Sequence, residues 1–520
     1  MTALPIDPVL PDLLAALGRH GRAVLQAPPG AGKTTRVPLA LLAEGRIKGR
    51  ILMLEPRRLA ARAAAERMAE TLGEAVGESV GYRVRGDAKV GKATRIEVVT
   101  EGILTRMIQD NPDLPGVGAV IFDEFHERSL NADLGLALTW EVRGALREDL
   151  VILVMSATLD AAPVAGLLDG APVITSQGRG FPIETRWRDR PAPANARLED
   201  SVADLIRTAL RDTTGGILAF LPGEGEIRRT AARLSDLPGG IALHQLFGAM
   251  PLAAQRAALR PEPPGRRKLV LATAIAETSL TIPDIAVVVD GGRARRARFD
   301  PASGMARLVT EPVSRAEADQ RRGRAGRVTQ GICYRNWTKG AEGALPAFPP
   351  AEIEATDLTG LALDLALWGA GDGSDLAFLT PPPAGAMSEA QKLLTGLGAL
   401  DAQGRITPHG RALARIPLHP RLGHMLTTGG KGAERLAALL ADRDPLRGQG
   451  VDLALRMRAL DDPGAMTADR GAVARIRDEA RRLARFAKGP ALSLAEQAAL
   501  AYPDRIGLRR AGDAPRYILS

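Results

Sequence analysis

The chain has 520 residues, a length that suits about three to four domains. Its residues are 45% hydrophobic and 25% charged, which is the composition of an ordinary globular protein. The net charge of +9 is carried mostly by arginine and indicates a polyanionic partner; a solvated arginine-rich surface is the alternative. Aromatic residues make up only 3% of the chain, so Ala, Leu, Val and Ile must fill the core.

Three classes of protein are excluded by the sequence. The single cysteine, Cys333, allows neither an internal disulfide nor a cysteine-based zinc site, and we expect it to lie in a buried strand. The first residues lack a basic region followed by an apolar core, so we do not expect a secretory protein. No stretch approaches the length of an apolar membrane span, and we therefore expect a cytoplasmic protein that does not enter a membrane.

The first predicted element is a phosphate-binding loop at residues 27–35, between a strand-like run at 23–25 and a helical pattern at 37–42. Backbone N–H groups of such a loop point at an anion, and small residues let the backbone approach it. We expect Lys33 to reach the β- and γ-phosphates and the Thr34 hydroxyl to bind Mg²⁺. The expected nucleotide-binding residues of this loop are Gly30, Ala31, Gly32, Lys33, Thr34 and Thr35.

One position of the loop departs from the usual pattern. Ala27 stands where the first glycine of G-x-x-x-x-G-K-[ST] is expected. The alternative for the loop alone is a Gly-Lys-Thr turn that caps an ordinary helix.

Apolar runs alternate with helical patterns over the first third of the chain, which predicts βαβ units and a parallel sheet. The expected strands are 51–54, 96–99, 119–122 and 151–155, with helices at 59–71 and 102–109. Ligands of such sheets bind at the carboxyl ends of the strands, where Asp123 and Glu124 lie. We expect Asp123 to hold the Mg²⁺ of a nucleotide and Glu124 to activate the attacking water, whereas a solvated acidic turn is the alternative.

Several motifs at these strand ends resemble those of the DEAH-box helicases. Residues 123–129 are similar to motif II with Phe in the third place, and residues 156–158 to motif III. Residues 55–61 and 100–102 are similar to motifs Ia and Ib. The resemblance implies that His126, Ser156 and Thr158 couple hydrolysis to strand movement.

A second strand–helix alternation follows a linker at residues 178–182, and it contains no second phosphate loop. We expect the nucleotide to lie between two similar domains, with charge supplied by the second. Residues 320–327 resemble motif VI and residues 273–279 resemble motif V, although Ala274 stands where the family usually has Asn. By matching positions, Arg324 and Arg327 are arginine fingers and Gln320 orients water or the γ-phosphate, so the implied catalytic residues are Lys33, Glu124, Gln320, Arg324 and Arg327.

The resemblance implies that the nucleic acid lies against motifs Ia, Ib and V, and hydroxyls and arginines at strand–helix junctions are suitable donors to its phosphates. The residues implied are Arg57, Arg58, Thr100, Glu101, Thr273 and Thr278. A β-hairpin is predicted around a turn at residues 301–304; in DEAH enzymes such a hairpin separates or holds strands, and an ordinary sheet hairpin is the alternative.

The pattern becomes helical after residue 350, with apolar helices at 358–368 and 391–398 and a short wing-like segment at 400–407. These features resemble the winged-helix and ratchet domains of DEAH helicases. The basic helix at 475–485 either touches a nucleic-acid backbone or is a solvated face. We predict a first RecA-like domain at residues 1–176, a second at 177–345, a winged-helix domain at 346–416 and a helical bundle at 417–520.

The chain as a whole resembles the bacterial HrpB-type helicases of the DEAH class, whose members usually continue beyond the point that matches residues 517–520. The resemblance implies a monomeric ATPase that uses ATP and Mg²⁺ to move along single-stranded RNA or DNA and to unwind duplexes. The alternative is a nucleotide-switched clamp or assembly factor that binds nucleic acid without separating strands.

Overall fold

The computed structural model describes residues 4–157, 161–177, 181–193, 195–250, 252–277, 282–300, 305–327, 329–446, 448–510 and 517–519. The chain divides into two compact units. The first comprises Met1–Thr356 with Leu376–Pro381, and the second comprises Asp357–Asp375 with Pro382–Ser520. The two units are described separately below.

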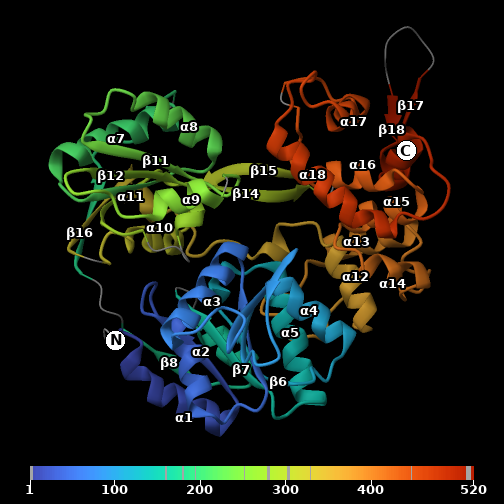
Figure 1. Cartoon of the computed structure of the whole chain (residues 1–520), viewed down its shortest axis with the longest axis horizontal. Helices are drawn as coiled ribbons and strands as arrows, with labels where there is room; N and C mark the ends of the chain where they lie inside the picture. Colours follow the sequence, from blue (N-terminus) through green and yellow to red (C-terminus); the bar gives the residue numbers. More distant parts are fainter. Residues whose placement is uncertain are drawn as a thin grey trace. The chain divides into compact units, whose positions relative to one another are not determined.

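The first unit begins with an eight-stranded sheet in the order β4-β3-β5-β2-β6-β7-β1-β8, shown in blue to teal in Figure 1. All neighbouring strands are parallel except β3 and β4. The strands are β1 (Arg22–Gln26), β2 (Arg50–Glu55), β3 (Val80–Val84), β4 (Asp87–Lys89), β5 (Ile96–Thr100), β6 (Val117–Phe122), β7 (Val151–Ser156) and β8 (Val173–Thr175).

Alternate residues of these strands face opposite layers of helices, as the two-residue period of a strand requires. The helices are α1 (Leu10–His20), α2 (Lys33–Glu44), α3 (Arg58–Leu72), α4 (Glu101–Asp110), α5 (Leu130–Ala145) and α6 (Ala161–Leu167). Side chains of α1, α2 and α3 share one core with strand residues such as Leu25 and Met53. On the other face, Gly135 of α5 lies close to Phe122 and Leu54.

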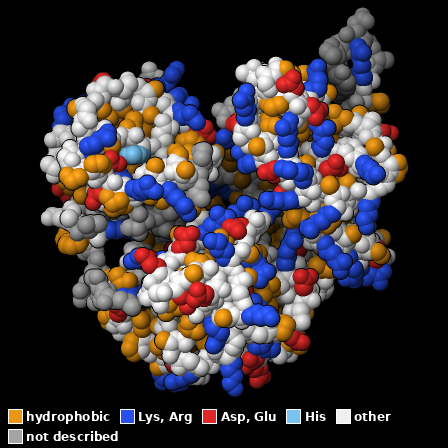
Figure 2. Space-filling model, in the orientation of Figure 1, with side chains coloured by type: hydrophobic (Ala, Val, Ile, Leu, Met, Phe, Trp, Pro, Cys, Tyr) orange, Lys and Arg blue, Asp and Glu red, His pale blue; other side chains and the backbone are white. Residues whose placement is uncertain are grey.

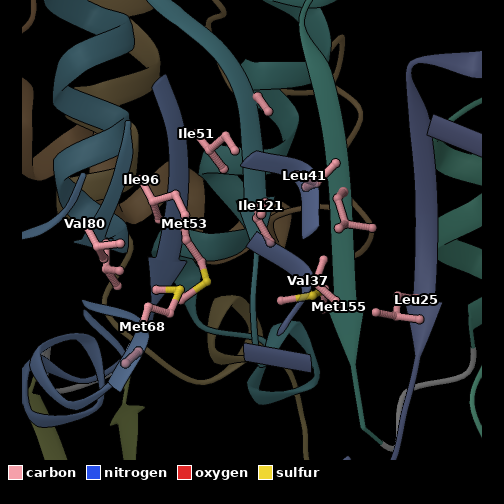
Figure 3. Close-up of a cluster of buried hydrophobic side chains, with 14 of the residues drawn as sticks. Leu25, Val37, Leu41, Ile51, Met53, Met68, Val80, Ile96, Ile121 and Met155 are labelled. Atoms are coloured by element: carbon pink, nitrogen blue, oxygen red, sulfur yellow. The ribbon is translucent and has the colours of Figure 1, made fainter. Parts of the chain in front are cut away.

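The core on the α2 and α3 side is almost entirely aliphatic, as the low aromatic content predicts. Figure 3 shows Val37 and Leu41 of α2 and Met68 of α3 among strand residues such as Ile51 and Ile121. These side chains are all buried. Dense aliphatic packing on this face fixes the strands, and so fixes the positions of the loops at their carboxyl ends.

The second sheet has six parallel strands in the order β11-β12-β10-β13-β16-β9. Its strands are β9 (Ile183–Arg188), β10 (Gly216–Phe220), β11 (Ile241–Leu246), β12 (Arg267–Ala272), β13 (Ile285–Asp290) and β16 (Gly331–Thr338). The helices of this domain are α7 (Leu198–Asp212), α8 (Glu224–Arg233), α9 (Leu252–Leu259), α10 (Arg315–Arg322) and α11 (Lys339–Glu342). Cys333 is buried in β16, as predicted.

The predicted hairpin is confirmed as the antiparallel pair β14 (Arg293–Asp300) and β15 (Met305–Pro312). Ion pairs hold it to the second domain: Arg295 contacts Glu226 at 2.9 Å, and Arg296 contacts Glu317. The turn predicted at 301–304 and residues 178–180 of the predicted linker lie outside the described residues.

The second unit is helical, drawn in orange to red in Figure 1. Its helices are α12 (Thr359–Trp368), α13 (Ala384–Gly396), α14 (Pro408–Ala414), α15 (Pro420–Thr428), α16 (Ala433–Leu440), α17 (Leu453–Asp461), α18 (Arg470–Leu483) and α19 (Leu494–Ala501). Helix α12 packs on α13 and α14, α16 packs on α18, and α15 packs on α19. The wing-like segment between α13 and α14 is reduced to one antiparallel bridge between Leu400 and Ile406, and the last elements are β17 (Gly507–Arg509) and β18 (Tyr517–Leu519).

Two sheet domains therefore precede a helical region, in the predicted order. The exact domain boundaries at 176, 345 and 416 stay predictions, because the compact units group the two sheets together. Among the residues that the structure describes, no helix combines the length and the apolar character that a bilayer span requires.

Candidate active site between two parallel sheets

The carboxyl ends of the central parallel strands bring most of the predicted motifs to one edge of the first sheet. The register pairs Gln26 of β1 with Ser156 of β7, and Glu55 of β2 with Thr100 of β5. Phe122, which precedes the acidic motif, pairs with Leu54 of β2. The phosphate loop and motifs Ia, Ib, II and III therefore start at neighbouring positions, although they are far apart in the sequence.

The phosphate loop joins β1 to α2 through two glycines with left-handed backbone conformations. Gly30 has φ +83° and Gly32, which is the N-cap of α2, has φ +95°. A Cβ on Gly32 would also lie 2.6 Å from Leu4 Cδ1, so only glycine fits there. The departure at Ala27 is accommodated, because Ala27 does not need a positive φ and simply extends β1 by donating its N–H to the Ser156 carbonyl at 3.0 Å.

Lys33 and Thr34, in the first turn of α2, meet the carboxylates of motif II. Lys33 Nζ lies 3.1 Å from Asp123 Oδ1 and 3.0 Å from Glu124 Oε1. The Thr34 hydroxyl donates to Asp123 Oδ2 at 2.6 Å. Burial acts to raise the pKa of Glu124. The opposite effect of Lys33 and of the other nearby positive groups is larger and lowers this pKa to about 2. Glu124 is therefore an ionised carboxylate in the free protein.

These residues fit a magnesium–nucleotide complex. Thr34 and Asp123 place a hydroxyl and a carboxylate in direct contact, and oxygen ligands of this kind are those that Mg²⁺ prefers. Lys33 is 3% exposed, so its ammonium lies inside the site where phosphates would meet the loop. Among the described residues, no group of three or more His, Cys, Asp or Glu side chains forms a metal cluster.

The backbone is strained at Glu124, the carboxylate predicted to activate water. Glu124 has φ +51°, a left-handed conformation that is unfavourable for a residue with a side chain and costs about 1–2 kcal/mol. The strained turn leads into the short helix η2 (Phe125–Glu127) and directs Glu124 to Lys33 and His126. Strain of this kind persists where the surrounding structure over-determines the conformation.

His126 contacts both motif II and motif III. Burial lowers its pKa to about 4, so the imidazole is neutral. Its Nδ1 accepts the Ala157 N–H at 3.3 Å, which leaves the proton on Nε2, 3.4 Å from Glu124 Oε2. Ser156 is buried beside this contact. The predicted coupling roles of His126 and Ser156 stay predictions, and Thr158 lies outside the described residues.

The arginines of motif VI reach this site from the second domain. Arg327 packs on the phosphate loop, with its Cζ 3.6 Å from where a Cβ on Gly30 would lie. Arg324 is buried and donates from Nε to the Glu277 carbonyl at 2.8 Å. Burial lowers the pKa of both guanidinium groups, that of Arg327 to about 10, and Arg327 lowers that of Arg324 further. A buried guanidinium group at Arg324 and a half-buried one at Arg327 suit a polyanionic ligand.

Gln320 is buried one turn before Arg324 and lines a cavity of about 710 Å³ between the two sheet domains. The cavity is bounded by motif II, motif V, motif VI and the start of β14, including His126, Glu127, Thr273, Glu277 and Arg293. The phosphate loop does not line it. Arg57 of motif Ia and Thr273 of motif V both line it.

The predicted nucleic-acid residues have different surroundings. Arg58 is exposed at the start of α3, and Thr100 and Thr273 are half-buried at the N-caps of α4 and of η3 (Ala274–Ala276). The Glu101 carboxylate is buried against the Ser129 hydroxyl, and burial raises its pKa to about 7, so it does not face solvent. Thr278 lies outside the described residues, and all of these roles stay predictions.

Sequence reasoning assigned no role to Glu55, and it expected Arg57 to bind nucleic acid. Glu55, at the end of β2, is 1% exposed, and its pKa is raised by burial and by the charges of Asp123 and Glu124. Arg57 bridges the two domains. The signal for Glu55 was present in the sequence, since an acidic residue ends a predicted strand beside the motif II strand.

A phosphate loop, a motif II carboxylate pair and arginines from the second sheet domain form the arrangement that the sequence predicted for a two-domain helicase core. Residues 9–165 match the DEAD/DEAH box helicase family, residues 200–329 the helicase conserved C-terminal domain, and residues 390–418 the winged-helix helicase associated domain (HA2). These matches confirm the predicted fold class of two RecA-like domains, a winged helix and further helices.

The relatives define the family more narrowly. The chain is 46% identical over 448 residues to the ATP-dependent RNA helicase HrpB of Escherichia coli, an alignment that covers 85% of this chain and 55% of HrpB. It is 36% identical to the ATP-dependent RNA helicase HrpA of E. coli (84% of this chain, 34% of HrpA). It is also 36% identical to the pre-mRNA-splicing factor ATP-dependent RNA helicase prp22 of Schizosaccharomyces pombe (82% of this chain, 37% of prp22).

The fold agrees with a solved structure. The crystal structure of the E. coli DEAH/RHA helicase HrpB superposes with a TM-score of 0.88 at 44% identity, covering 99% of this chain and 65% of that one. The chain therefore resembles the DEAH-box helicases of the HrpB type. It spans between about a third and just over half of the length of these curated relatives.

Proposed function

We propose that this chain is an ATP-dependent RNA helicase, which hydrolyses ATP with Mg²⁺ and uses the cycle to move along a single strand and displace its partner. The observation that carries this proposal is the composite site. Lys33, Asp123 and Glu124 come from the first sheet, and Arg324 and Arg327 reach them from the second. A site built from two domains makes hydrolysis depend on their relative position, which is what a motor requires.

Each residue has a distinct task in this proposal. Thr34 and Asp123 hold Mg²⁺, which neutralises charge on the phosphates when bound. Glu124, ionised and in contact with neutral His126, accepts a proton from the attacking water. Gln320 orients that water or the γ-phosphate. Arg324 and Arg327 stabilise the charge that develops in the transition state, a contribution worth about 10³–10⁵ in rate in related phosphoryl transfers.

RNA is the proposed strand, because the curated relatives reported above are named as RNA helicases. The net charge of +9 supports binding through backbone phosphates. Figure 2 shows numerous Lys and Arg side chains on the visible face of the helical unit, and the exposed Arg475, Arg481 and Arg482 of α18 belong to this unit. A monomeric, cytoplasmic protein without a membrane partner remains part of the proposal.

The test is steady-state ATP hydrolysis titrated with single-stranded RNA and, separately, with single-stranded DNA of the same sequence. We expect Mg²⁺-dependent hydrolysis that RNA stimulates more than DNA. Glu124→Gln should lower kcat by about 10²–10⁴-fold, because it removes the proton acceptor while leaving the phosphate loop intact. Arg19→Gln, at an exposed position of α1, is the matched control and should hydrolyse ATP like the parent.

A strand-displacement assay on a tailed duplex completes the test. Displaced strand in the presence of ATP, and none with Glu124→Gln, supports the helicase. Nucleic-acid-stimulated hydrolysis without displaced strand contradicts it and favours the nucleotide-switched clamp. Equal hydrolysis by the parent and by Lys33→Ala would refute the site assignment itself.

A further inference from the structure

Arg57 lies at the junction of the two sheet domains and contacts both of them. It is the N-cap residue of α3, in extended conformation two residues after the end of β2. Its Nη2 lies 2.9 Å from Glu127 Oε1 in the first domain. Its Nη1 donates to the Ala274 carbonyl in the second domain at 3.3 Å. A single planar guanidinium group therefore spans the junction.

The partner in the second domain is a backbone atom of a short segment that also holds an arginine finger. Ala274 begins η3, and Glu277 is the residue that follows this helix. The Glu277 carbonyl accepts from Arg324 Nε at 2.8 Å, and the Glu277 carboxylate binds Arg321 at 2.6 Å. Arg57 thus holds one end of the segment whose other end positions Arg324.

The partner in the first domain belongs to motif II. Glu127 is the last residue of η2, the short helix that also contains His126 and follows Glu124. Arg57 and Glu127 are partly buried, with side chains 29% and 20% exposed, and both line the cavity between the domains. The bridge therefore connects the helix after the catalytic carboxylate to the segment that carries the arginine finger.

We infer that Arg57 is a positioning residue for hydrolysis, which sets Arg324 against Glu124 by holding motif II and the motif V segment together. The inference rests on the proposed function, and it replaces the expectation that Arg57 binds the strand. An arginine is required because two N–H groups of one rigid plane reach partners on opposite sides, which a lysine ammonium cannot do with the same geometry. Ala274 has no side-chain amide, and its backbone carbonyl is the group that accepts the hydrogen bond from Arg57.

The experiment compares Arg57→Gln, Arg57→Lys and the control Arg19→Gln in ATP hydrolysis without nucleic acid and in RNA binding without nucleotide. We expect Arg57→Gln to lower kcat between about 2- and 25-fold, the range of a coupling residue, with KM for ATP unchanged. Arg57→Lys should recover only part of this loss. Affinity for a fluorescent single-stranded RNA should equal that of the parent, since the inferred role does not involve the strand.

A double-mutant cycle with Arg324→Ala separates a positioning role from a general defect. Because Arg57 acts through Arg324, Arg57→Gln should cause no further loss of kcat in the Arg324→Ala background. Additive losses in the cycle, or weaker RNA binding with an unchanged kcat, would overturn the inference. Absence of hydrolysis in the parent would instead refute the proposed function. Equal melting temperatures of the parent and the variants would exclude misfolding as the cause of a lower kcat.

Discussion

Lys33 forms ion pairs with two carboxylates in the nucleotide-free protein. Its ammonium lies within 3.1 Å of Asp123 and 3.0 Å of Glu124, and all three side chains are buried. Two carboxylates so close together repel each other unless a cation compensates them. The same side chain that is expected to bind phosphate therefore also stabilises the site before the nucleotide arrives.

Lys33→Ala should destabilise the nucleotide-free first unit as well as abolish hydrolysis. Removing one partner of a buried ionic cluster leaves uncompensated charge and costs about 3–5 kcal/mol. The pKa of Glu124 should rise from its present value of about 2, because Lys33 is the main charge that lowers it. Urea unfolding of the parent and the variant without nucleotide measures the effect.

The double variant Lys33→Ala/Glu124→Gln is the control for this prediction. Neutralising one carboxylate should restore part of the lost stability, since the remaining charge has no like neighbour so close. Equal unfolding free energies for Lys33→Ala and the parent would show that the cluster does not contribute as described.

The residues of the nucleotide site were predictable because their chemistry is local in sequence. The loop at residues 27–35 and the pair Asp123 and Glu124 carry their functions in short motifs. The bridging role of Arg57 was not predictable, because its partner Ala274 is in another domain and offers only a backbone carbonyl. The burial of Glu101 could not be predicted either, since its carboxylate packs against Ser129, the N-cap residue of α5, which is distant in the sequence.

Two helices of the second unit meet through a pair of histidines. His409 Nε2 of α14 lies 2.9 Å from His424 Nδ1 of α15, with the rings edge to face. Both imidazoles are partly buried, and burial lowers the pKa of each from its ordinary value; the charge of His409 lowers that of His424 further. A hydrogen bond between two imidazoles needs at least one nitrogen without a proton.

Acidification should loosen the contact between α14 and α15. The folded state binds fewer protons than the unfolded state when a histidine pKa is lowered, so its stability rises with pH and falls as the pH drops below about 6.5. Hydrogen exchange of peptides covering residues 408–428, corrected for intrinsic exchange, should therefore be faster at pH 5.5 than at pH 7.5. His424→Gln should remove most of this pH dependence, and an equally strong dependence in that variant would contradict the assignment.

The predicted elements agree with the structure where apolar periodicity is strong. Strands β2, β6 and β7 match their apolar runs, but α2 begins at Lys33, ahead of the pattern at 37–42, because its first turn consists of polar loop residues. Strands β8 and β9 were not predicted, since their residues are largely half-buried or exposed and give no continuous apolar run. Edge strands obtain their pairing from neighbours rather than from their own sequence.

At the scale of the whole molecule, both halves of the nucleotide site belong to one compact unit, and the helical unit contributes none of the residues assigned to it. A ligand that binds only the folded site stabilises the unit that contains it, by about 2.7 kcal/mol at a concentration of 100 times Kd. The two units are large enough to unfold separately, so a multidomain chain of this kind need not show a single transition.

A non-hydrolysable ATP analogue with Mg²⁺ should therefore raise the melting temperature of one transition and leave that of the other unchanged. Calorimetry measures both transitions. The ligand-sensitive transition belongs to the first unit, because Lys33, Glu124 and Arg327 all lie within it. Arg327→Ala should reduce the shift, since Arg327 packs on the phosphate loop from the second sheet. An equal shift of both transitions would contradict the division, because it would mean that nucleotide binding stabilises the helical unit to the same extent.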